Sequence, residues 1–303
     1  MSQAAERSKA EEARAALPRL ANRATRPSGP PLRTALGVAL AAVGCAPPGP
    51  KAPLSATEGM RSSMFVGNAL DARISFLRVG DPAGPCVVLV HGTPGSATGW
   101  ADYLVAPPAG ADVVALDRPG FGASDPGGAV TSLATQAAAI MALLATDRRP
   151  VVLLGHSLGA PIVAWAAARL AAEQPDRSVA IVMLAGSLDP AQERVHALQH
   201  VGAWAPVQWL LPRAIRNANA ELMALKPELE ALGPMLLTVK ARVVIVHGTA
   251  DDLVPVANVA YMQERFSGAR CITTVLLEGQ NHFLPWNSEG AVREALRVAL
   301  ESS

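Results

Sequence analysis

The sequence predicts an α/β fold in which a mostly parallel, eight-stranded sheet is flanked by helices. Six short apolar runs, rich in β-branched residues, recur between residues 86 and 279. Each run is continuous rather than alternating, as expected for strands that are buried on both faces of a parallel sheet. Longer segments with apolar residues at helical spacing separate most of these runs. Strands that alternate with helices build a sheet covered by helices on both sides.

The predicted elements follow one another in a regular order. Residues 64–80, MFVGNALDARISFLRVG, predict two short strands around a turn. The six apolar runs then predict strands in CVVLVHG (86–92), DVVALD (112–117), VVLLGHS (151–157), SVAIVMLAG (178–186), ARVVIVHG (241–248) and CITTVLLEG (271–279). Helices are expected over residues 131–145, 158–173, 256–266 and 290–300.

The interval between the sixth and seventh strands is too long for a simple crossover. Residues 187–240 span about fifty positions, and a loop of that length without secondary structure is uncommon. The segment looks helical, so we expect an inserted helical cap. The chain therefore divides into residues 1–60 outside the fold, a core of residues 61–186 and 241–303, and a cap of residues 187–240.

Residues 30–50, PPLRTALGVALAAVGCAPPGP, have the layout of an export signal. A basic region ends at Arg33, an apolar segment of nine residues follows, and Gly44-Cys45 precedes a proline-rich stretch. This resembles a bacterial lipoprotein signal, in which Cys45 would be lipidated and would anchor the protein to a membrane. The alternative is a disordered tail rich in alanine and proline. The location therefore stays open between the cell envelope, secretion and the cytoplasm.

Charge and hydropathy argue against a nucleic-acid-binding protein and against a protein with a transmembrane helix. The formal net charge is +1, with seven basic and three acidic residues in positions 1–45 and a net charge of −3 in the remainder. Nucleic-acid binding needs a basic patch or stripe, which the sequence does not show. A transmembrane helix needs about 18 to 20 consecutive apolar residues, and no apolar run of this sequence is that long.

Ser157 lies in GHSLG, between a predicted buried strand and a predicted helix. A G-x-S-x-G turn at this junction is so sharp that it exposes the serine hydroxyl at the end of the sheet. Small residues are needed at positions 155 and 159 because the strand and helix backbones approach closely there. Ligands of open α/β sheets bind at this edge. Ser157 is therefore a candidate nucleophile.

A serine nucleophile needs a base and a third group that orients the base. The chain order in this architecture is serine, acid, histidine, and of six histidines only His282 follows both Ser157 and a well-placed acid. Asp251 and Asp252 follow the seventh strand, and Asp189 follows the sixth. We interpret Asp189 as the N-cap of the first cap helix, although all three strand ends could face one pocket.

Acyl transfer also needs N–H donors for the negative charge of the tetrahedral intermediate. The backbone N–H of Leu158, directly after the nucleophile, is one candidate. The loop VHGTPGSATGW after the third strand supplies the second, and the N–H of Thr93 is the best placed. The glycines of this loop allow its backbone to turn toward the reacting carbon.

Five segments, in this order, resemble motifs of the α/β-hydrolase superfamily: HGTPGS, DRPGFGASD, GHSLGA, HGTADDLVP and GQNH. The resemblance covers residues 63–302 and implies that Ser157 is the nucleophile and His282 the general base. In the superfamily's D-x-L-V-P pattern the acid is the first aspartate, which implies Asp251 rather than Asp252. The backbone amides of Thr93 and Leu158 match the superfamily's oxyanion hole. The resemblance also implies that the DRPGFGASD loop is structural, and it implies no metal or organic cofactor.

The nucleophile also separates this chain from relatives such as haloalkane dehalogenases and epoxide hydrolases, which carry aspartate at the elbow. Ser157 predicts a carboxylesterase that cleaves small to medium apolar esters through an acyl-enzyme. Trp204, Trp209 and Trp286 are expected to line the pocket, or else to pack the cap onto the core. The alternatives are a cofactor-free haloperoxidase-like enzyme, a carbon–carbon bond hydrolase, an acyltransferase, or a non-catalytic, envelope-anchored binding protein on the same fold.

Overall fold

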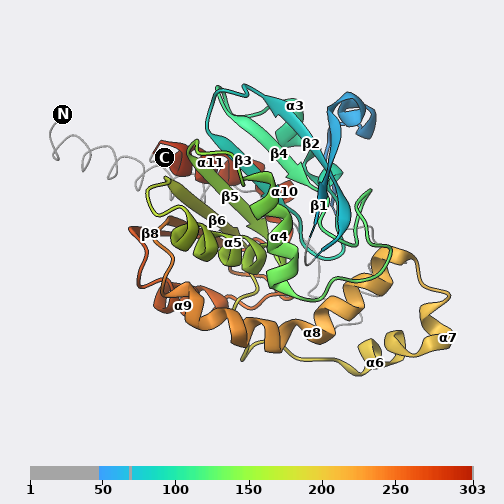
Figure 1. Cartoon of the computed structure of the whole chain (residues 1–303). Coiled ribbons are helices and arrows are strands. Elements are labelled where there is room, and N and C mark those ends of the chain that lie inside the picture. The colour runs from blue at the N-terminus through green and yellow to red at the C-terminus, as the bar shows by residue number, and fades with distance from the viewer. Residues whose placement is uncertain (1–47, 68–69, 302–303) are drawn as a thin grey trace, which may run out of the picture.

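Eight strands form one sheet in the order β1-β2-β4-β3-β5-β6-β7-β8 (Figure 1). The computed structural model describes residues 48–67 and 70–301. The strands are β1 (Arg61–Val66), β2 (Ala72–Gly80), β3 (Cys86–Val90), β4 (Asp112–Leu116), β5 (Val151–His156), β6 (Val179–Leu184), β7 (Arg242–Gly248) and β8 (Cys271–Leu277). β2 pairs antiparallel with β1 and β4, and β3 to β8 are mutually parallel. The predicted fold class is confirmed.

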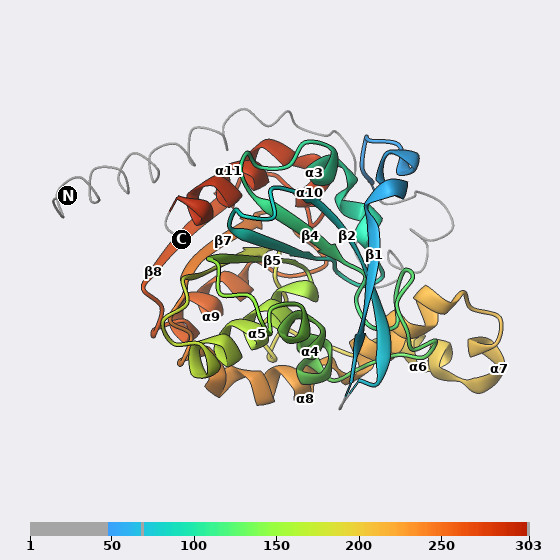
Figure 2. The same cartoon turned by 45° about the horizontal axis from the view of Figure 1, so that its top comes forward.

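Helices cover both faces of the sheet (Figure 2). One face carries α4 (Leu133–Leu143), α5 (Gly159–Glu173), α8 (Arg213–Leu236) and α9 (Ala257–Arg265). The other carries the 3₁₀ helix η2 (Ala97–Trp100), α3 (Ala101–Val105), α10 (Leu284–Asn287) and α11 (Glu289–Leu300). The four helices predicted in the core, α4, α5, α9 and α11, begin and end within two residues of their expected bounds.

The central strands are buried on both faces, which explains their continuous apolar runs. In β3, Val88 and Val90 pack into the cluster beneath α4 and α5. Val87 and Leu89 alternate with them and pack into the cluster beneath α3 and α11. All four side chains are fully buried. Since neither face meets solvent, no position of the strand can be polar.

The cap segment, residues 187–240, contains α6 (Ala197–Ala203), α7 (Ala205–Gln208) and α8. α8 packs against α5, and the side chains on its inner stripe are buried among core residues: Leu225, Leu229, Leu232 and Leu236. α6 and α7 instead extend from one end of the molecule (Figure 1). The second half of the cap segment therefore completes the core, as does Leu188 at its start, while α6 and α7 stand away from it.

The described fold begins earlier in the chain than residue 61. The backbone amides of Lys51 and Ala52 donate to the buried carboxylate of Asp102 at 3.0 and 2.7 Å. The 3₁₀ helix η1 (Leu54–Met60) follows and buries Thr57. The expectation that residues 51–60 lie outside the fold is wrong, because these contacts fix them against α3.

Cys45 and most of the signal-like stretch lie outside the described residues. The lipoprotein interpretation therefore stays a prediction. Within the described part of the chain, no helix is both long enough and apolar enough to cross a membrane.

The turn between β5 and α5 depends on two glycines. A methyl group on Gly155 would lie 2.4 Å from the carbonyl oxygen of Gly159, and one on Gly159 would lie 2.4 Å from that of Val90. These contacts are with backbone, which cannot rotate away. The close strand–helix approach expected from the sequence is thus present.

We expect Gly155→Ala to lower the free energy of unfolding by about 1–3 kcal/mol or more, because the added carbon overpacks this turn. Urea unfolding followed by circular dichroism measures the change. Gly127→Ala is the matched control, since a methyl group there meets nothing within 4 Å. Equal stability of the two variants would contradict the packing argument.

Candidate active site

Parallel strands bring the candidate residues to one edge of the sheet. Because β3, β5, β7 and β8 are parallel, the segments after them meet at their shared carboxyl edge. Thr93 follows β3, Ser157 follows β5, Asp251 follows β7 and His282 follows β8. The residues predicted from four separate motifs thus lie at the same end of the sheet.

Ser157 sits in a left-handed backbone conformation, with φ of 55°. Such a conformation costs energy in a residue other than glycine and must be held by its surroundings. Its N–H donates to the carbonyl oxygen of Leu184 at 2.9 Å. Its Cβ is so close to the β3 loop that a methyl group on Gly92 would lie 2.8 Å from it. The sharp turn predicted from GHSLG is therefore present, and the β3 loop lies directly against the serine.

His282 and Asp251 form a buried pair. Nδ1 of His282 lies 2.8 Å from Oδ2 of Asp251, while Oδ1 of Asp251 accepts the backbone N–H groups of Leu253 and Val254 at 2.9 and 2.8 Å. An ionised carboxylate can only accept hydrogen bonds, so Nδ1 of His282 carries the ring proton. Nε2 then has no proton and keeps a basic lone pair. Burial alone would raise the pKa of Asp251, but the hydrogen bond from His282 and the backbone donors lower it below its usual value.

The other two candidate acids are placed differently. The carboxylate of Asp189 accepts the backbone N–H of Ala191 at 2.9 Å and the side-chain amide of Gln192 at 3.3 Å. It caps a turn and not a helix, since α6 begins only at Ala197, so the expected N-cap role was wrong in that respect. Asp252 is exposed. Of the three, only Asp251 bonds to His282.

His156 ties the loop of His282 to the serine turn. Its Nε2 lies 2.9 Å from the carbonyl oxygen of His282, and the two rings lie 4.9 Å apart. A carbonyl can only accept, so Nε2 donates. The neighbouring Ser157 hydroxyl forms no hydrogen bond to His282 or to any other described residue, so its proton is not committed elsewhere. The hydrogen bond between a nucleophile and its base often forms only when substrate binds.

Burial, and then the neighbouring His282, lower the pKa of His156 to about 3. The folded protein therefore keeps this ring neutral, whereas the unfolded chain protonates it below about pH 6.5. Protonation of His156 therefore favours the unfolded chain. The folded protein keeps its full stability at neutral pH and loses part of it as the pH falls from about 6.5, the pKa in the unfolded chain, toward about 3, the pKa in the folded protein.

We expect the stability advantage of the wild type over His156→Gln to shrink by about 2 kcal/mol between about pH 7 and pH 5. Urea unfolding of both proteins at each pH measures it. His91 and His247 are also buried histidines with lowered pKa values, but they are common to both proteins. A difference that does not vary with pH would contradict a neutral, buried His156.

The loop after β3 is held by a second buried histidine. Nε2 of His91 accepts the backbone N–H of Arg118 at 3.1 Å, so Nδ1 carries the proton and donates to the carbonyl oxygen of Gly92 at 2.7 Å. Burial, and then Arg118, hold the pKa of His91 well below its usual range. Among the described residues, neither the N–H of Thr93 nor that of Leu158 has an acceptor. Both remain available to a ligand.

The DRPGFGASD loop after β4 is structural, as the resemblance implies. The side chain of Asp117 is fully buried and accepts the amides of Ala97 and Ala123 at 2.7 and 3.1 Å. Arg61 of β1 donates to the same carboxylate at 2.7 Å. Asp117 thus joins this loop to β1 and to η2.

A buried ion pair, which the sequence did not reveal, links the cap segment to the loop after β3. Arg118 and Glu221 of α8 are both almost fully buried and meet at 2.7 and 3.1 Å. Arg118 also donates to the carbonyl oxygen of Gly92 at 3.0 Å, and the Thr93 hydroxyl donates to Glu221 at 2.6 Å. Gln136 of α4 completes the network with short bonds to both charged groups. Glu221 therefore helps to position Gly92 and Thr93.

Glu221 could have been noticed from the helical spacing of its segment. Ala218, Glu221, Leu225 and Leu229 fall on one face of α8, and all four are buried. A carboxylate on the apolar face of a helix must be paired, since an isolated buried charge costs too much. The partner could not be read from the sequence because Arg118 lies 103 positions away.

We expect Glu221→Ala to lower the free energy of unfolding by about 3–5 kcal/mol, because it leaves the charge of Arg118 buried without a partner. Urea unfolding measures this loss. Glu230→Ala on the same helix is the control, since Glu230 is exposed. A loss below about 1 kcal/mol would show that Arg118 finds another partner or water.

Of the three tryptophans expected to line the pocket, one lies beside the site and two do not. Trp286 lies beside the site, where its indole nitrogen donates to the carbonyl oxygen of Gly99 at 2.9 Å and its ring meets His156 at 5.8 Å. Trp204 and Trp209 are 65% and 89% exposed. The expectation that these two line the pocket is wrong, because the segment carrying them extends away from the sheet edge into solvent.

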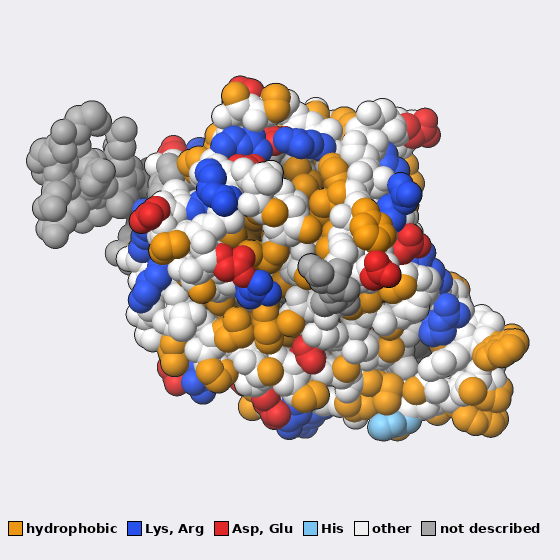
Figure 3. Space-filling view, viewed as in Figure 1, with side chains coloured by type: hydrophobic (Ala, Val, Ile, Leu, Met, Phe, Trp, Pro, Cys, Tyr) orange, Lys and Arg blue, Asp and Glu red, His pale blue; other side chains and the backbone are white. Residues whose placement is uncertain are grey.

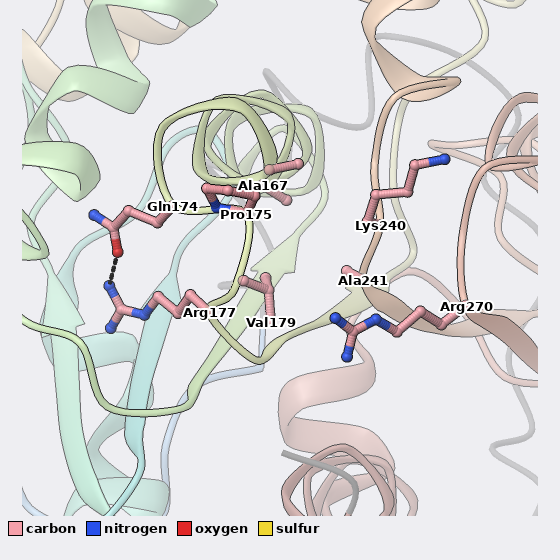
Figure 4. Close-up of a pocket in the computed structure, with 9 residues that line it drawn as sticks. Ala167, Gln174, Pro175, Arg177, Val179, Lys240, Ala241 and Arg270 are labelled. Atoms are coloured by element: carbon pink, nitrogen blue, oxygen red, sulfur yellow. Dashed lines mark hydrogen bonds between the residues drawn. The ribbon is translucent and has the colours of Figure 1, made fainter.

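A hollow at the opposite edge of the sheet offers no substrate site (Figure 4). It lies by Val179 at the start of β6, and its volume of about 10 Å³ holds about one water molecule. Arg177 turns toward Gln174, away from Lys240 and Arg270 (Figure 4). Within residues 48–67 and 70–301, no three side chains form a group suited to a metal ion.

Comparison with known families agrees with this geometry. A family model described as alpha/beta hydrolase fold matches residues 85–219, which contain the β3 loop and the Ser157 turn. Together with the eight-stranded, mostly parallel sheet, this match shows that the chain has the α/β-hydrolase fold. A search of curated protein sequences gave no significant match.

Solved structures share the fold at low sequence identity. A monoacylglycerol lipase from Paleococcus ferrophilus has a TM-score of 0.61 at 20% identity, over 76% of this chain and 99% of the lipase. An esterase from Exiguobacterium antarcticum has a TM-score of 0.61 at 18% identity, over 80% and 100% of the two chains. A bromoperoxidase from Bacillus anthracis has a TM-score of 0.59 at 20% identity, over 80% and 99%. These similarities show the fold alone.

Proposed function

We propose that the protein is a serine hydrolase that cleaves small to medium apolar carboxylic esters. One observation carries the proposal. Ser157 projects from a strained left-handed turn at the carboxyl edge of the sheet, and the Asp251-bound His282 lies at the same edge, tied to that turn by His156. A serine, a histidine and a buried acid in this relation form the arrangement of nucleophilic acyl transfer.

In the proposed reaction, Oγ of Ser157 attacks the ester carbonyl while Nε2 of His282 takes the hydroxyl proton. The carbonyl oxygen becomes negative and accepts hydrogen bonds from the free N–H groups of Thr93 and Leu158. His282 returns its proton to the leaving alcohol as the carbon–oxygen bond breaks, which leaves an acyl-enzyme on Ser157. Water, deprotonated by His282, then attacks the acyl carbon, and His282 returns that proton to Oγ of Ser157 as the bond to the acyl group breaks and the carboxylic acid leaves. Asp251 fixes the Nδ1–H tautomer throughout.

The apolar character of the substrate is supported by the surroundings of the base. Phe283 packs edge-on against His282 at 5.9 Å, and Trp286 lies beyond it at 6.1 Å from Phe283. Aromatic side chains beside the reacting atoms favour apolar acyl or alcohol groups. The esterase and the monoacylglycerol lipase with this fold act on esters by name, which agrees with the proposal.

Hydrolysis of p-nitrophenyl esters, from acetate to dodecanoate, tests the proposed substrate class in the full-length protein. We expect turnover with an optimum at short or medium acyl chains. An optimum at dodecanoate would contradict the preference for small esters. No turnover of any ester by folded protein would contradict the esterase assignment.

A further inference from the structure

The first half of the cap segment carries an exposed apolar surface that the proposed reaction does not use. Residues 195–210, here called the cap tip, hold six of the thirteen large hydrophobic side chains that are exposed in the described part of the chain. They are Val195, Leu198, Val201, Trp204, Trp209 and Leu210. A contiguous apolar patch marks a surface that meets a partner or a membrane.

The charge pattern of the cap tip narrows the choice of partner. Residues 195–212 contain no Asp, Glu, Lys or Arg, although 17% of the chain is charged. Arg194 and Arg213 flank this uncharged stretch on its two sides. An apolar segment with tryptophans, without acidic residues and with the exposed Arg194 at its start, is complementary to an anionic lipid surface.

The cap tip is supported from below by polar contacts. The side-chain amide of Asn219 on α8 donates to the carbonyl oxygen of Gln199 on α6 at 2.9 Å. Arg213 donates to the carbonyl oxygen of Pro126, in the loop after β4, at 3.0 Å. These bonds fix the start of α8 to the core and α6 to α8. The apolar side chains are thus presented outward from a fixed base.

The views agree on where this surface lies. Figures 1 and 2 show α6 and α7 at one end of the molecule, apart from the sheet. Figure 3 shows hydrophobic side chains gathered on that end. The cap tip thus lies at an extremity of the described part of the chain, where a flat surface can reach it.

We propose that the cap tip inserts into the headgroup region of an anionic phospholipid bilayer. Trp204, Trp209 and Leu210 enter the boundary between headgroups and acyl chains, where tryptophan is favoured because its ring is apolar and its N–H is polar. Neither indole N–H donates to a described residue. Arg194 remains at the level of the lipid phosphates. This interaction is independent of the proposed ester hydrolysis.

The test uses the full-length protein and vesicles of equal parts phosphatidylcholine and phosphatidylglycerol with brominated acyl chains, which quench nearby tryptophan. Co-sedimentation measures binding, and fluorescence measures insertion. We expect Trp209→Ser combined with Leu210→Ser to weaken binding by at least about tenfold. Leu276→Ser, at an exposed position on β8, is the matched control and should bind as the wild type does.

A second variant separates the cap tip from any other membrane contact of the chain. Trp204→Phe combined with Trp209→Phe keeps the apolar surface but removes its probes, so we expect wild-type binding with most of the quenching lost. Quenching equal to that of the wild type would overturn the proposal. So would full binding by the serine variant, or absence of wild-type binding.

Two further outcomes would also overturn it. Equal binding to vesicles of phosphatidylcholine alone would refute the anionic surface. A wild-type dimer that the serine variant converts to a monomer, without vesicle binding, would show that a second copy of the chain covers the cap tip.

Discussion

Replacing Ser157 with alanine is expected to lower kcat for ester hydrolysis by about 10⁵- to 10⁶-fold, because the acyl-enzyme can no longer form. The substitution keeps Cβ, so the close contact with Gly92 is unchanged. The hydroxyl forms no hydrogen bond to a described residue, so its removal leaves no buried group unpaired. The fold should therefore survive, and the loss should be one of chemistry. Steady-state kinetics with the best p-nitrophenyl ester measures it.

Ser63→Ala is the matched control for this experiment. Ser63 is exposed on β1, an edge strand that carries none of the candidate site residues, and should tolerate the change without loss of activity. If Ser157→Ala kept more than about one per cent of wild-type activity, the nucleophile would have to be another group.

Replacing Asp251 with asparagine is expected to lower kcat by about 10⁴-fold. The backbone N–H groups of Leu253 and Val254 both point at Oδ1, so the amide oxygen of asparagine must take that position. The amide nitrogen then faces Nδ1 of His282. Because that nitrogen donates, Nδ1 must accept, and the ring proton moves to Nε2. The histidine can then no longer take a proton from Ser157.

Asp189→Asn is the control that decides between the two candidate acids. Asp189 holds a turn through Ala191 and Gln192, and none of its contacts reaches His282. We expect this variant to keep its activity within about twofold. The reverse pattern, with activity lost at Asp189 and kept at Asp251, would place the acid after β6.

The strands and core helices could be predicted because their causes are local in the sequence. A strand buried on both faces must be apolar at every position, and the run CVVLV of β3 shows this directly. The order of motifs at the ends of such strands then predicted which residues share an edge. Parallel pairing brings them together without further information.

The cap segment could not be predicted in the same way. An apolar side chain there can face the core, a pocket or solvent, and the spacing is the same in each case. Trp204 and Trp209 were expected in the pocket but lie exposed at the cap tip. Leu225 and Leu229, in the same segment, pack into the core.

The pairing of Arg118 with Glu221 could not be predicted from the sequence for a related reason. The two residues are far apart in the chain, and only the path of α8 over the sheet brings them together. A charge on an apolar helix face indicates that a partner exists, but its identity depends on tertiary structure.

The central claim is that Ser157 is an activated nucleophile, and labelling with a fluorophosphonate tests it most directly. This reagent phosphonylates a serine that a neighbouring base deprotonates, and it does so whether or not the natural ester is known. Intact mass and peptide mapping identify the site. The account predicts one adduct, on Ser157, formed by the wild type and absent from Ser157→Ala and, at short times, from Asp251→Asn. A folded wild type that gains no adduct, or gains it on another residue, would contradict the account.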